Sequence, residues 1–364
     1  MSGVLKKKLI NHFRRIKTYS GVECRNLISF HVDGGLGDHL IAAQFIFDLR
    51  RQTIPFDFDV YSRRVELNEW LYGRIDGFRH AFLPKANYKI FRDEYCLELN
   101  VHSCPSVRGG LKLECEKRAD FRVLSKVFSL IEERSQVYRR YVDHRPHFDG
   151  YFGQQVSLLG HGRHDFGHHM AGISYTGLPL PIEVDHAWLD RLSLTPRRYI
   201  TLSNGYDDAM KAGDHGLITK VFPRYDELVA QLRRLIPSDI QMVQVGAANS
   251  TPIRGVDHYL ANRTSLKEVA GLLSNSLIHI DNEGGLVHLA HHVGTRSAVI
   301  FGPTQHEYFG YKDNLNFAPS ECGGCWWMRP DWMQVCVRGD SRPRCMASHD
   351  ISLMAEKIAA TVVV

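Results

Sequence analysis

The stretch DNEGGLVHLAHHVGTRSAVIFGPT, residues 281–304, decides the fold. It follows the β-branched apolar run SLIHI (276–280), contains a short helical pattern and leads into a second apolar run at 297–301. This order predicts a strand, a glycine turn, a helix and another strand. Gly284 and Gly285 fall at the turn, where a missing side chain lets a ligand approach the backbone. Because a helix N-terminus attracts anions, the turn predicts a diphosphate site, although a single glycine-rich turn is also compatible with a plain connection.

The composition indicates a globular protein of two domains. The chain of 364 residues is too long for one ordinary core, and it has 44% hydrophobic and 23% charged residues. Its formal net charge of +5 permits an anionic ligand but does not favour nucleic acid as a partner. No apolar run approaches the roughly 20 residues of a membrane span, and the N-terminus lacks the features of a signal peptide. We therefore expect a cytoplasmic protein whose eight cysteines are thiols.

The N-terminal segment, residues 1–22, is basic and contains no acidic residue. Leu5, Leu9, Phe13 and Ile16 share one face of a predicted helix, and lysines and arginines line the rest. Such a helix can rest on an anionic membrane, which would place the protein at the inner face of the cytoplasmic membrane. A solvated helix and a mitochondrial transit peptide have the same pattern, so the residues alone leave these three interpretations open.

A second strand, glycine turn and helix lie near the start of the chain. NLISFHV (26–32) runs into DGGLGDHL (33–40) and then into a helical pattern. Gly35 and Gly37 keep this loop open, and Asp38 lies where the helix begins. Asp38 is therefore either a carboxylate that caps the helix or a general base that takes a proton from a hydroxyl nucleophile.

Strands and helices alternate through both halves of the chain and predict parallel sheets covered by helices. The stretch TGLPLPIEVD (176–185), with two prolines, predicts the boundary between an α/β domain over 23–183 and a second over 184–318. In the second, Lys220 precedes a helix at the same sheet edge as Gly284. A lone lysine there is usually exposed to solvent, but an ammonium at this edge can also neutralise a leaving phosphate.

Histidines cluster in HGRHDFGHHM, at His161, His164, His168 and His169. No acidic residue or cysteine has a convincing local spacing to them, so we expect exposed helix and loop histidines rather than a metal site.

Four motifs together resemble glycosyltransferase family 9, the heptosyltransferases. They are GGLGDHL (34–40), KVFP (220–223), TSLKEVAGLLSNS (264–276) and EGGLVHLAHHVGTRSAVIFGPT (283–304). The resemblance implies the α/β architecture called GT-B, in which two Rossmann-like domains face across a cleft. It places the sugar nucleotide on the second domain and the acceptor mainly on the first. It also implies inverting transfer without a catalytic metal, commonly from ADP-heptose.

The resemblance assigns roles to individual residues. Asp38 matches the carboxylate regarded as the base, with Gly35 and Gly37 in the acceptor-side loop. The donor-binding positions are Lys220, Glu283, Gly284, Gly285, Leu286 and His288. Glu283 stands where the family has aspartate, and Gly284 removes a hydroxyl, so the transferred sugar or the base is less certain than the diphosphate site. The chemistry agrees, because sugar transfer needs an activated acceptor hydroxyl and a stabilised diphosphate leaving group.

A cysteine-rich stretch, residues 319–347, follows the second domain. Its cysteines are Cys322, Cys325, Cys336 and Cys345. A C-x2-C turn presents two sulfurs to one ion, and four thiolates suit tetrahedral zinc or iron. We expect a structural metal finger with no open position for catalysis, the alternatives being free thiols or disulfides. This finger is similar to the iron finger of the autotransporter heptosyltransferases, which modify protein hydroxyls and assemble into large rings.

Several expectations complete the prediction. The acceptor stays open between a protein serine and a saccharide such as lipopolysaccharide core or capsule, and a homo-oligomer is expected. A helix over 351–361, within the segment 348–364, should pack across the domains. The remaining cysteines should be buried small hydrophobes; they are Cys24, Cys96, Cys104 and Cys115.

Two other classes of function also fit the chain. A GT-B sugar-nucleotide epimerase or hydrolase would use the same cleft without an acceptor. A non-enzymatic nucleic-acid binder would use the cysteine finger and the basic N-terminus, and a steep salt dependence of its affinity would reveal it. The nearly balanced charge argues against this second class.

Overall fold

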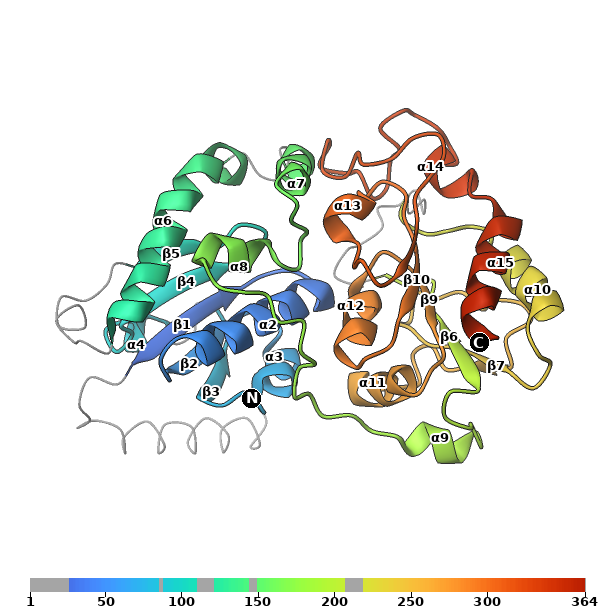
Figure 1. Cartoon of the computed structure of the whole chain (residues 1–364), viewed down its shortest axis with the longest axis horizontal. Coiled ribbons are helices and arrows are strands. Elements are labelled where there is room, and N and C mark those ends of the chain that lie inside the picture. Colours follow the sequence, from blue (N-terminus) through green and yellow to red (C-terminus); the bar gives the residue numbers. More distant parts are fainter. Residues whose placement is uncertain (1–25, 85–87, 110–120, 144–148, 207–218, 364) are drawn as a thin grey trace, which may run out of the picture.

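The computed structural model describes residues 26–84, 88–109, 121–143, 149–206 and 219–363 (Figure 1). The basic segment 1–22, with its predicted membrane contact, lies outside the described residues. Within these ranges, no helix combines the length and the apolar character that crossing a membrane requires.

The N-terminal half contains a five-stranded sheet with the order β3-β2-β1-β4-β5. Its strands are β1 (Leu27–Val32), β2 (Asp57–Tyr61), β3 (Phe78–Phe82), β4 (Leu97–Val101) and β5 (Ser106–Gly109). Neighbouring strands run parallel except for β4 and β5. The order reverses between β1 and β4, and open α/β sheets bind ligands at the carboxyl ends of the strands at such a point.

Helices connect and cover this sheet. They are α2 (Leu36–Gln52), α3 (Val65–Tyr72), α4 (Tyr88–Phe91), α6 (Arg122–Asp143), α7 (Asp149–Leu158) and α8 (Phe166–Ala171). Ten residues of α2 are buried, more than one face of a helix can supply. The helix is buried on several sides because it packs between its own sheet and α12 of the other half.

The C-terminal half contains a six-stranded parallel sheet with the order β11-β10-β9-β6-β7-β8. Its strands are β6 (Tyr199–Leu202), β7 (Gln241–Gln244), β8 (His258–Tyr259), β9 (His279–Asn282), β10 (Ser297–Ile300) and β11 (Leu315–Phe317). The helices are α9 (Ala187–Arg191), α10 (Tyr225–Leu235), α11 (Leu266–Ser274), α12 (Gly285–His292), α13 (His306–Phe309), α14 (Arg344–Ala347) and α15 (Ile351–Val362). Read in chain order, the strands follow the doubly wound Rossmann pattern, with the switch point between β6 and β9.

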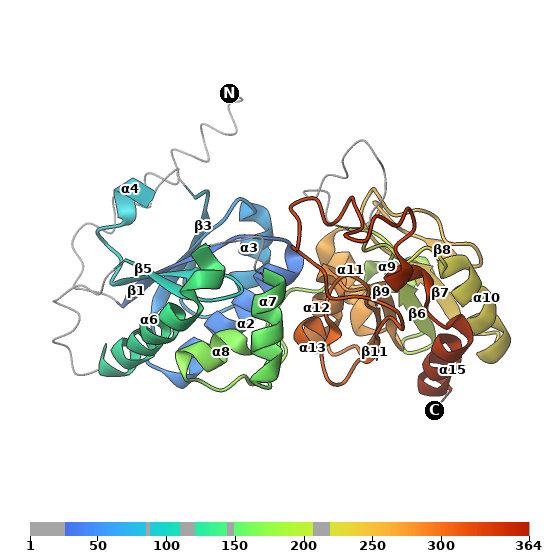
Figure 2. The same cartoon turned by 90° about the horizontal axis from the view of Figure 1, so that it is seen from above.

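The two halves lie side by side and meet where α2 contacts α12 (Figures 1 and 2). One hydrophobic cluster joins them, with Leu40 and Ala43 on α2 and Leu289 and Ala290 on α12. Residues 173–186, which include the predicted boundary, form neither helix nor strand and connect the halves. This is the predicted GT-B arrangement of two α/β units facing across a cleft.

The last helix departs from the prediction. We expected it to pack across the domains, but α15 packs against α10 and β11 of the C-terminal half. Its buried side chains, among them Ile351, Met354 and Ile358, extend the apolar cluster of that half. The amphipathic pattern indicated a buried face without saying which neighbour would cover it.

The isolated cysteines agree with the prediction as far as they are described. Cys96 and Cys104 are buried, at 1% and 2% exposure. Cys24 and Cys115 lie outside the described residues.

Candidate active site

The two glycine turns meet at the junction of the halves. A Cβ atom added to Gly37 would lie 2.5 Å from Cδ2 of His288, and one added to Gly285 would lie 2.9 Å from Cβ of Leu36. Gly284 is different, because its nearest such neighbour is the Asn282 carbonyl oxygen at 3.7 Å. Gly37 and Gly285 therefore let the N-terminal ends of α2 and α12 approach closely, and Gly284 leaves open space in the turn.

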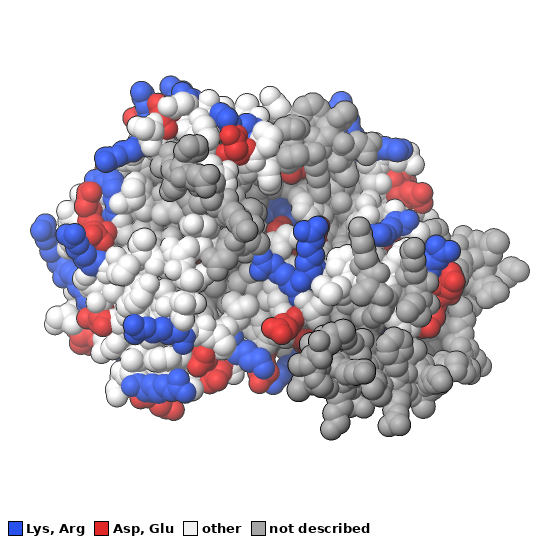
Figure 3. All heavy atoms as spheres, turned by 180° about the vertical axis from the view of Figure 1, so that it is seen from behind, with Lys and Arg blue, Asp and Glu red and all other residues white. Residues whose placement is uncertain are grey.

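A cleft of about 1710 Å³ opens between the halves beside these turns. All the predicted catalytic, donor-binding and acceptor-side residues line it: Gly35, Gly37, Asp38, Lys220, Glu283, Gly284, Gly285, Leu286 and His288. Arg63, Arg64 and Arg163 line it as well. Figure 3 shows the cleft face from behind, with Lys and Arg side chains gathered in a hollow near its middle. The structure thus brings the predicted set together, and the role of each residue stays a prediction.

Asp38 lies in the first turn of α2, and both of its carboxylate oxygens accept hydrogen bonds. The Gly35 backbone N–H donates to Oδ2 at 3.0 Å, and the Arg163 guanidinium donates to Oδ1 at 2.6 Å. Burial raises the pKa of the carboxyl, but the Arg163 charge and the Gly35 hydrogen bond outweigh burial and lower the pKa to about 2. Asp38 therefore caps its helix, as one interpretation predicted, and is also an ionised carboxylate at the cleft.

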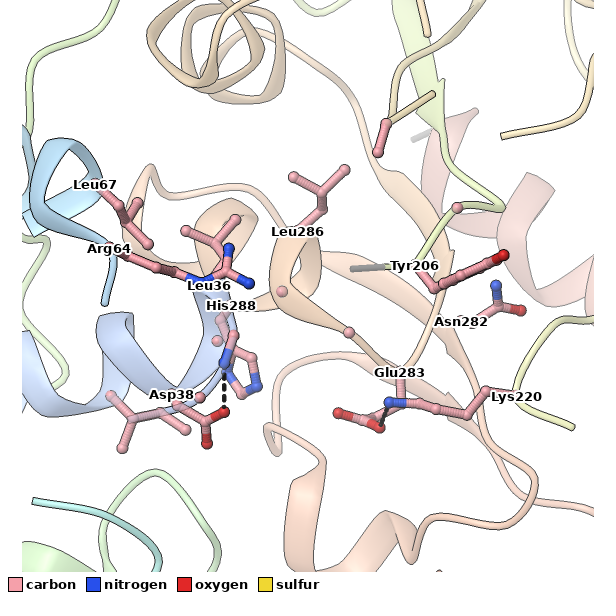
Figure 4. A pocket seen from close by; sticks show the side chains of 18 of the residues that line it. Leu36, Asp38, Arg64, Leu67, Tyr206, Lys220, Asn282, Glu283, Leu286 and His288 are labelled. Atoms are coloured by element: carbon pink, nitrogen blue, oxygen red, sulfur yellow. Dashed lines mark hydrogen bonds and ion pairs between the residues drawn. The ribbon is translucent and has the colours of Figure 1, made fainter. Parts of the chain in front are cut away.

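Lys220 and Glu283 form an ion pair on the opposite side of the pocket (Figure 4). Nζ of Lys220 lies 2.6 Å from Oε2 of Glu283, and Glu283 is buried, with 7% exposure. The predicted run SLIHI is shifted, because the strand pairs with β10 as far as Asn282 and so spans His279–Asn282. Asn282 then accepts a hydrogen bond from the Phe222 backbone N–H at 2.9 Å, which fixes the loop that carries Lys220.

His288 is buried at the contact between the halves. Its Nδ1 lies 2.8 Å from the Tyr311 hydroxyl. Burial lowers the pKa of His288 to about 3, so the ring is neutral at physiological pH. A neutral ring supplies no positive charge to a diphosphate, so any contact of His288 with the donor is a hydrogen bond.

The four clustered histidines are more buried than predicted. His168 is buried at 1% exposure, and its Nε2 lies 2.9 Å from the buried Asp48 carboxylate. His161 pairs with Asp165 at 2.9 Å. The expectation of exposed histidines was wrong because Asp48 and its partner are 120 residues apart, beyond any local spacing. In the described part of the chain, no group of three or more His, Cys, Asp or Glu side chains is arranged to hold a metal ion.

The cysteine-rich stretch packs between the halves. A Cβ on Gly150 would lie 2.9 Å from the Trp326 carbonyl oxygen, and one on Gly153 would lie 3.2 Å from Cζ2 of the Trp326 ring. The stretch also holds the loop before Lys220, because Thr219 donates to the carbonyls of Trp332 and Met333, at 2.7 and 2.8 Å. It therefore contacts α7 of one half and the lysine loop of the other.

The four predicted metal ligands lie near one another without forming a metal site in the described geometry. Burial, together with the nearby thiols of Cys322, Cys325 and Cys336, raises the pKa of the Cys345 thiol to about 12. Burial likewise raises the pKa of Cys325, with added effects of Cys336 and Cys322. The donor set fits a tetrahedral thiolate site, and the metal stays a prediction.

Sequence reasoning missed Arg163, which binds Asp38 from 125 residues away. It lies inside the HGRHDFGHHM stretch, in which the sequence analysis considered only the histidines as candidate functional residues. The only signal in the sequence was a basic residue in a loop, and such a signal fits many arginines.

Residues 241–323 match the family model of glycosyltransferase family 9 (heptosyltransferase). This stretch contains β9, α12 and the Glu283 to Gly285 turn, so the family match coincides with the C-terminal side of the cleft. The protein is therefore a glycosyltransferase, as the motifs predicted. No curated protein matches this chain in sequence.

Solved structures share the fold of this chain. Dodecameric iron-containing heptosyltransferase TibC, in complex with ADP-D-beta-D-heptose, is 14% identical, with 94% of this chain and 76% of that chain covered and a TM-score of 0.56; it comes from enterotoxigenic E. coli. The glycosyl transferase family 9 protein from Veillonella parvula is 12% identical, with 94% and 98% covered and a TM-score of 0.57. E. coli ADP-heptose lps heptosyltransferase II is 13% identical, with 92% and 98% covered and a TM-score of 0.50. At these identities the likeness shows the GT-B fold.

Proposed function

We propose that this glycosyltransferase moves a heptose from ADP-heptose to an acceptor hydroxyl, with inversion at the anomeric carbon. The observation that carries the proposal is the placement of opposite charges across one cleft. Asp38 approaches from α2, and the Lys220–Glu283 pair approaches from the other half (Figure 4). The N-terminus of α12 opens onto the same cleft, where its free N–H groups favour an anion.

These groups match the charges that sugar transfer develops. The acceptor oxygen attacks the anomeric carbon, its proton passes to the Asp38 carboxylate, and the bond from the anomeric carbon to the diphosphate oxygen breaks. Negative charge then grows on the departing ADP, where Lys220 and the α12 N-terminus stabilise it. When the diphosphate takes up Lys220, Glu283 is released from its ion pair and can accept hydrogen bonds from hydroxyls of the sugar.

ADP-heptose is the proposed donor because two kinds of observation favour it. The family 9 match covers the C-terminal side of the cleft, and the similar fold of TibC was solved with ADP-D-beta-D-heptose. The longer carboxylate of Glu283 and the missing hydroxyl at Gly284 are the positions where another sugar would first be accommodated.

Thermal unfolding with a panel of ligands tests the donor. A ligand that binds only the folded state raises Tm, and a concentration of about 100 times Kd stabilises by roughly 2.7 kcal/mol. ADP and ADP-heptose should raise Tm, whereas UDP- and GDP-sugars at the same concentration should not. A selective shift with UDP or GDP ligands would reject ADP-heptose, and no shift with any nucleotide would reject the donor site.

Product analysis separates transfer from the alternative reactions. With ADP-heptose alone, an epimerase or hydrolase forms a new sugar or a free sugar, whereas a transferase needs an acceptor hydroxyl. The acceptor is a protein serine or a saccharide of the bacterial surface, and incubation with each kind identifies it. Liposome flotation and sedimentation test the proposed membrane contact of residues 1–22 and the proposed homo-oligomer.

We also propose that the four cysteines hold a structural iron or zinc ion. The support is the proximity of the four cysteines, which raises the pKa of Cys325 and of Cys345, together with the donor chemistry. Because the same stretch anchors Thr219 next to Lys220, the metal would also fix the diphosphate lysine.

Metal analysis of the purified protein tests this second proposal. Cys325→Ser should lose the metal, lower Tm and weaken ADP affinity. Cys96→Ser is the matched control, since Cys96 is buried in the N-terminal core and should affect Tm without affecting metal content. Full metal content in Cys325→Ser would reject the site.

A further inference from the structure

Arg163 is a buried arginine at the cleft, in the loop between α7 and α8. Its side chain is 5% exposed, and its guanidinium makes two described contacts. Nη2 donates to Oδ1 of Asp38 at 2.6 Å, and Nη1 donates to the carbonyl of His102, which follows β4, at 3.3 Å. An arginine buried to this degree needs such partners, because an unpaired buried charge is costly. Arg163 is therefore held in one orientation toward Asp38.

The backbone of the same residue is attached to the other half of the protein. The Arg163 N–H donates to the carbonyl of Tyr308, in α13, at 2.6 Å. The preceding Gly162 lies close to the same atom, since an added Cβ there would be 3.1 Å from the Tyr308 oxygen. One residue thus bonds to the C-terminal half through its backbone and to the N-terminal half through its side chain.

We propose that Arg163 is a positioning residue that links the contact between the halves to the state of Asp38. When the halves are in contact, Tyr308 fixes the loop and the guanidinium holds the Asp38 carboxylate ionised and oriented. When they separate, the loop loses this anchor and Asp38 loses a fixed partner. The inference rests on the proposed function, in which Asp38 is the base.

Hydrogen-bond capacity allows Asp38 to serve Arg163 and a substrate together. Each carboxylate oxygen has two acceptor sites, and one is used at Oδ1 and one at Oδ2 by the described contacts. The acceptor hydroxyl can therefore donate to a remaining site. After transfer, the nearby positive charge disfavours the protonated carboxyl, so the proton leaves to solvent and the base is restored.

Other titratable groups surround the pair. His102 and Arg163 favour the ionised form of Asp38, and His39 and His288 are influenced by Asp38 in turn. Tyr308 and Asp149 act on Arg163. Burial lowers the pKa of His39 to about 4 and that of His288 to about 3, so both are neutral above pH 5. The two histidines titrate in the range where the acid limb of Arg163→Gln is expected. Both remain in Arg163→Gln and in Arg163→Lys, so comparing these two variants isolates the effect of the Arg163 charge.

The test is the pH dependence of kcat/KM for Arg163→Gln and Arg163→Lys, measured on the full chain with ADP-heptose and the acceptor. The wild type should show no loss from a carboxyl group down to about pH 5. In Arg163→Gln the acid limb should move up by about 1 to 2 pH units, with kcat reduced about tenfold or more at pH 7.5 and KM for the donor changed less than about twofold. Arg163→Lys keeps the positive charge, so its acid limb should lie close to the wild-type position.

A second variant addresses the anchor without touching the guanidinium. Gly162→Ala places a methyl group 2.8 Å from the His164 ring and 3.1 Å from the Tyr308 carbonyl oxygen, so the loop must shift. The acid limb should then move in the same direction by a smaller amount. Equal loss of activity at every pH in Arg163→Gln, with an unmoved acid limb, would overturn the proposal. Full activity of Asp38→Asn would instead overturn the base itself, so the two failures are distinguishable. Should Arg163→Gln not fold, the Lys and Gly162→Ala variants carry the test.

Discussion

The two glycine turns have the same local design, and each carries a carboxylate paired with a cation, but the two cations differ. Each follows a parallel strand at a switch point of its sheet and opens a helix toward the cleft. At the first turn an aspartate is held by an arginine, and at the second a glutamate holds a lysine. Both pairs have an N–O separation of 2.6 Å, and each is formed within its own half of the chain.

The difference shows how the work is divided between the halves. At the second turn, an arriving diphosphate can replace Glu283 as the partner of Lys220, because both are anions. At the first turn, a neutral acceptor hydroxyl cannot replace Arg163, so that pair stays formed while the hydroxyl binds Asp38. The donor side therefore exchanges its ion pair during the reaction, and the acceptor side keeps its pair.

Removing the Asp38 carboxylate should have the largest effect. Asp38→Asn keeps the size of the side chain but removes the proton acceptor, so kcat should fall by about 10² to 10⁴. ADP should bind with nearly unchanged affinity, because the donor pair lies in the other half. Steady-state kinetics and calorimetric titration measure both quantities. Undiminished turnover of Asp38→Asn would show that the first glycine turn carries no general base, and the contrast between the two turns would then be wrong.

Removing the Lys220 ammonium should have the next largest effect. Lys220→Ala leaves Glu283 buried without its partner and removes charge from the leaving group, so kcat/KM should fall by about 10² to 10³. Lys267→Ala is the matched control, because Lys267 pairs with Glu183 on a surface where both are more than 40% exposed. If the two variants bind ADP equally well, Lys220 does not face the diphosphate.

The glycines of the second turn should separate packing from binding. Gly285→Ala forces a methyl group against Leu36 and should cost about 1 to 3 kcal/mol of unfolding free energy. Gly284→Ala meets only ordinary contacts in an extended backbone, so stability should change little. If the diphosphate approaches this turn, Gly284→Ala should nevertheless weaken ADP binding. Chemical unfolding and ADP titration of both variants give the comparison.

The smallest effect concerns stability at acid pH. The folded-state pKa of Asp38 is lowered to about 2, below the usual value near 3.9. The contribution of the ionised Asp38 carboxylate to folding stability is therefore fully present above about pH 4 and is lost as the pH falls toward 2. Because 31% of the Asp38 side chain is exposed, we expect its ionised form to contribute only about 1 kcal/mol to the free energy of unfolding. In urea unfolding, the wild type should lose its stability advantage over Asp38→Asn between about pH 4 and pH 2. A difference in unfolding free energy that stays constant over this range would contradict the prediction.

Local patterns predicted the alternation of strands and helices and both glycine turns, because these depend on periodicity and on glycine within a few residues. They did not predict short elements such as β5 and β8, and they shifted the strand before Gly284. The motifs also named the residues that line the cleft. Contacts between distant segments were beyond this reasoning: Arg163 with Asp38, His168 with Asp48, and α15 with α10. Even the role of Gly37 changed, since its missing side chain accommodates His288 of the other half.

The position of Trp326 has an optical consequence. Its ring lies over Gly153 of α7 and stacks on the Tyr308 ring, with the two ring centroids 5.8 Å apart, and its side chain is 5% exposed. Separation of the halves would expose this indole to water and shift its fluorescence to longer wavelength. The protein therefore carries an intrinsic reporter of cleft opening, readable by stopped-flow on the time scale of turnover without an attached dye.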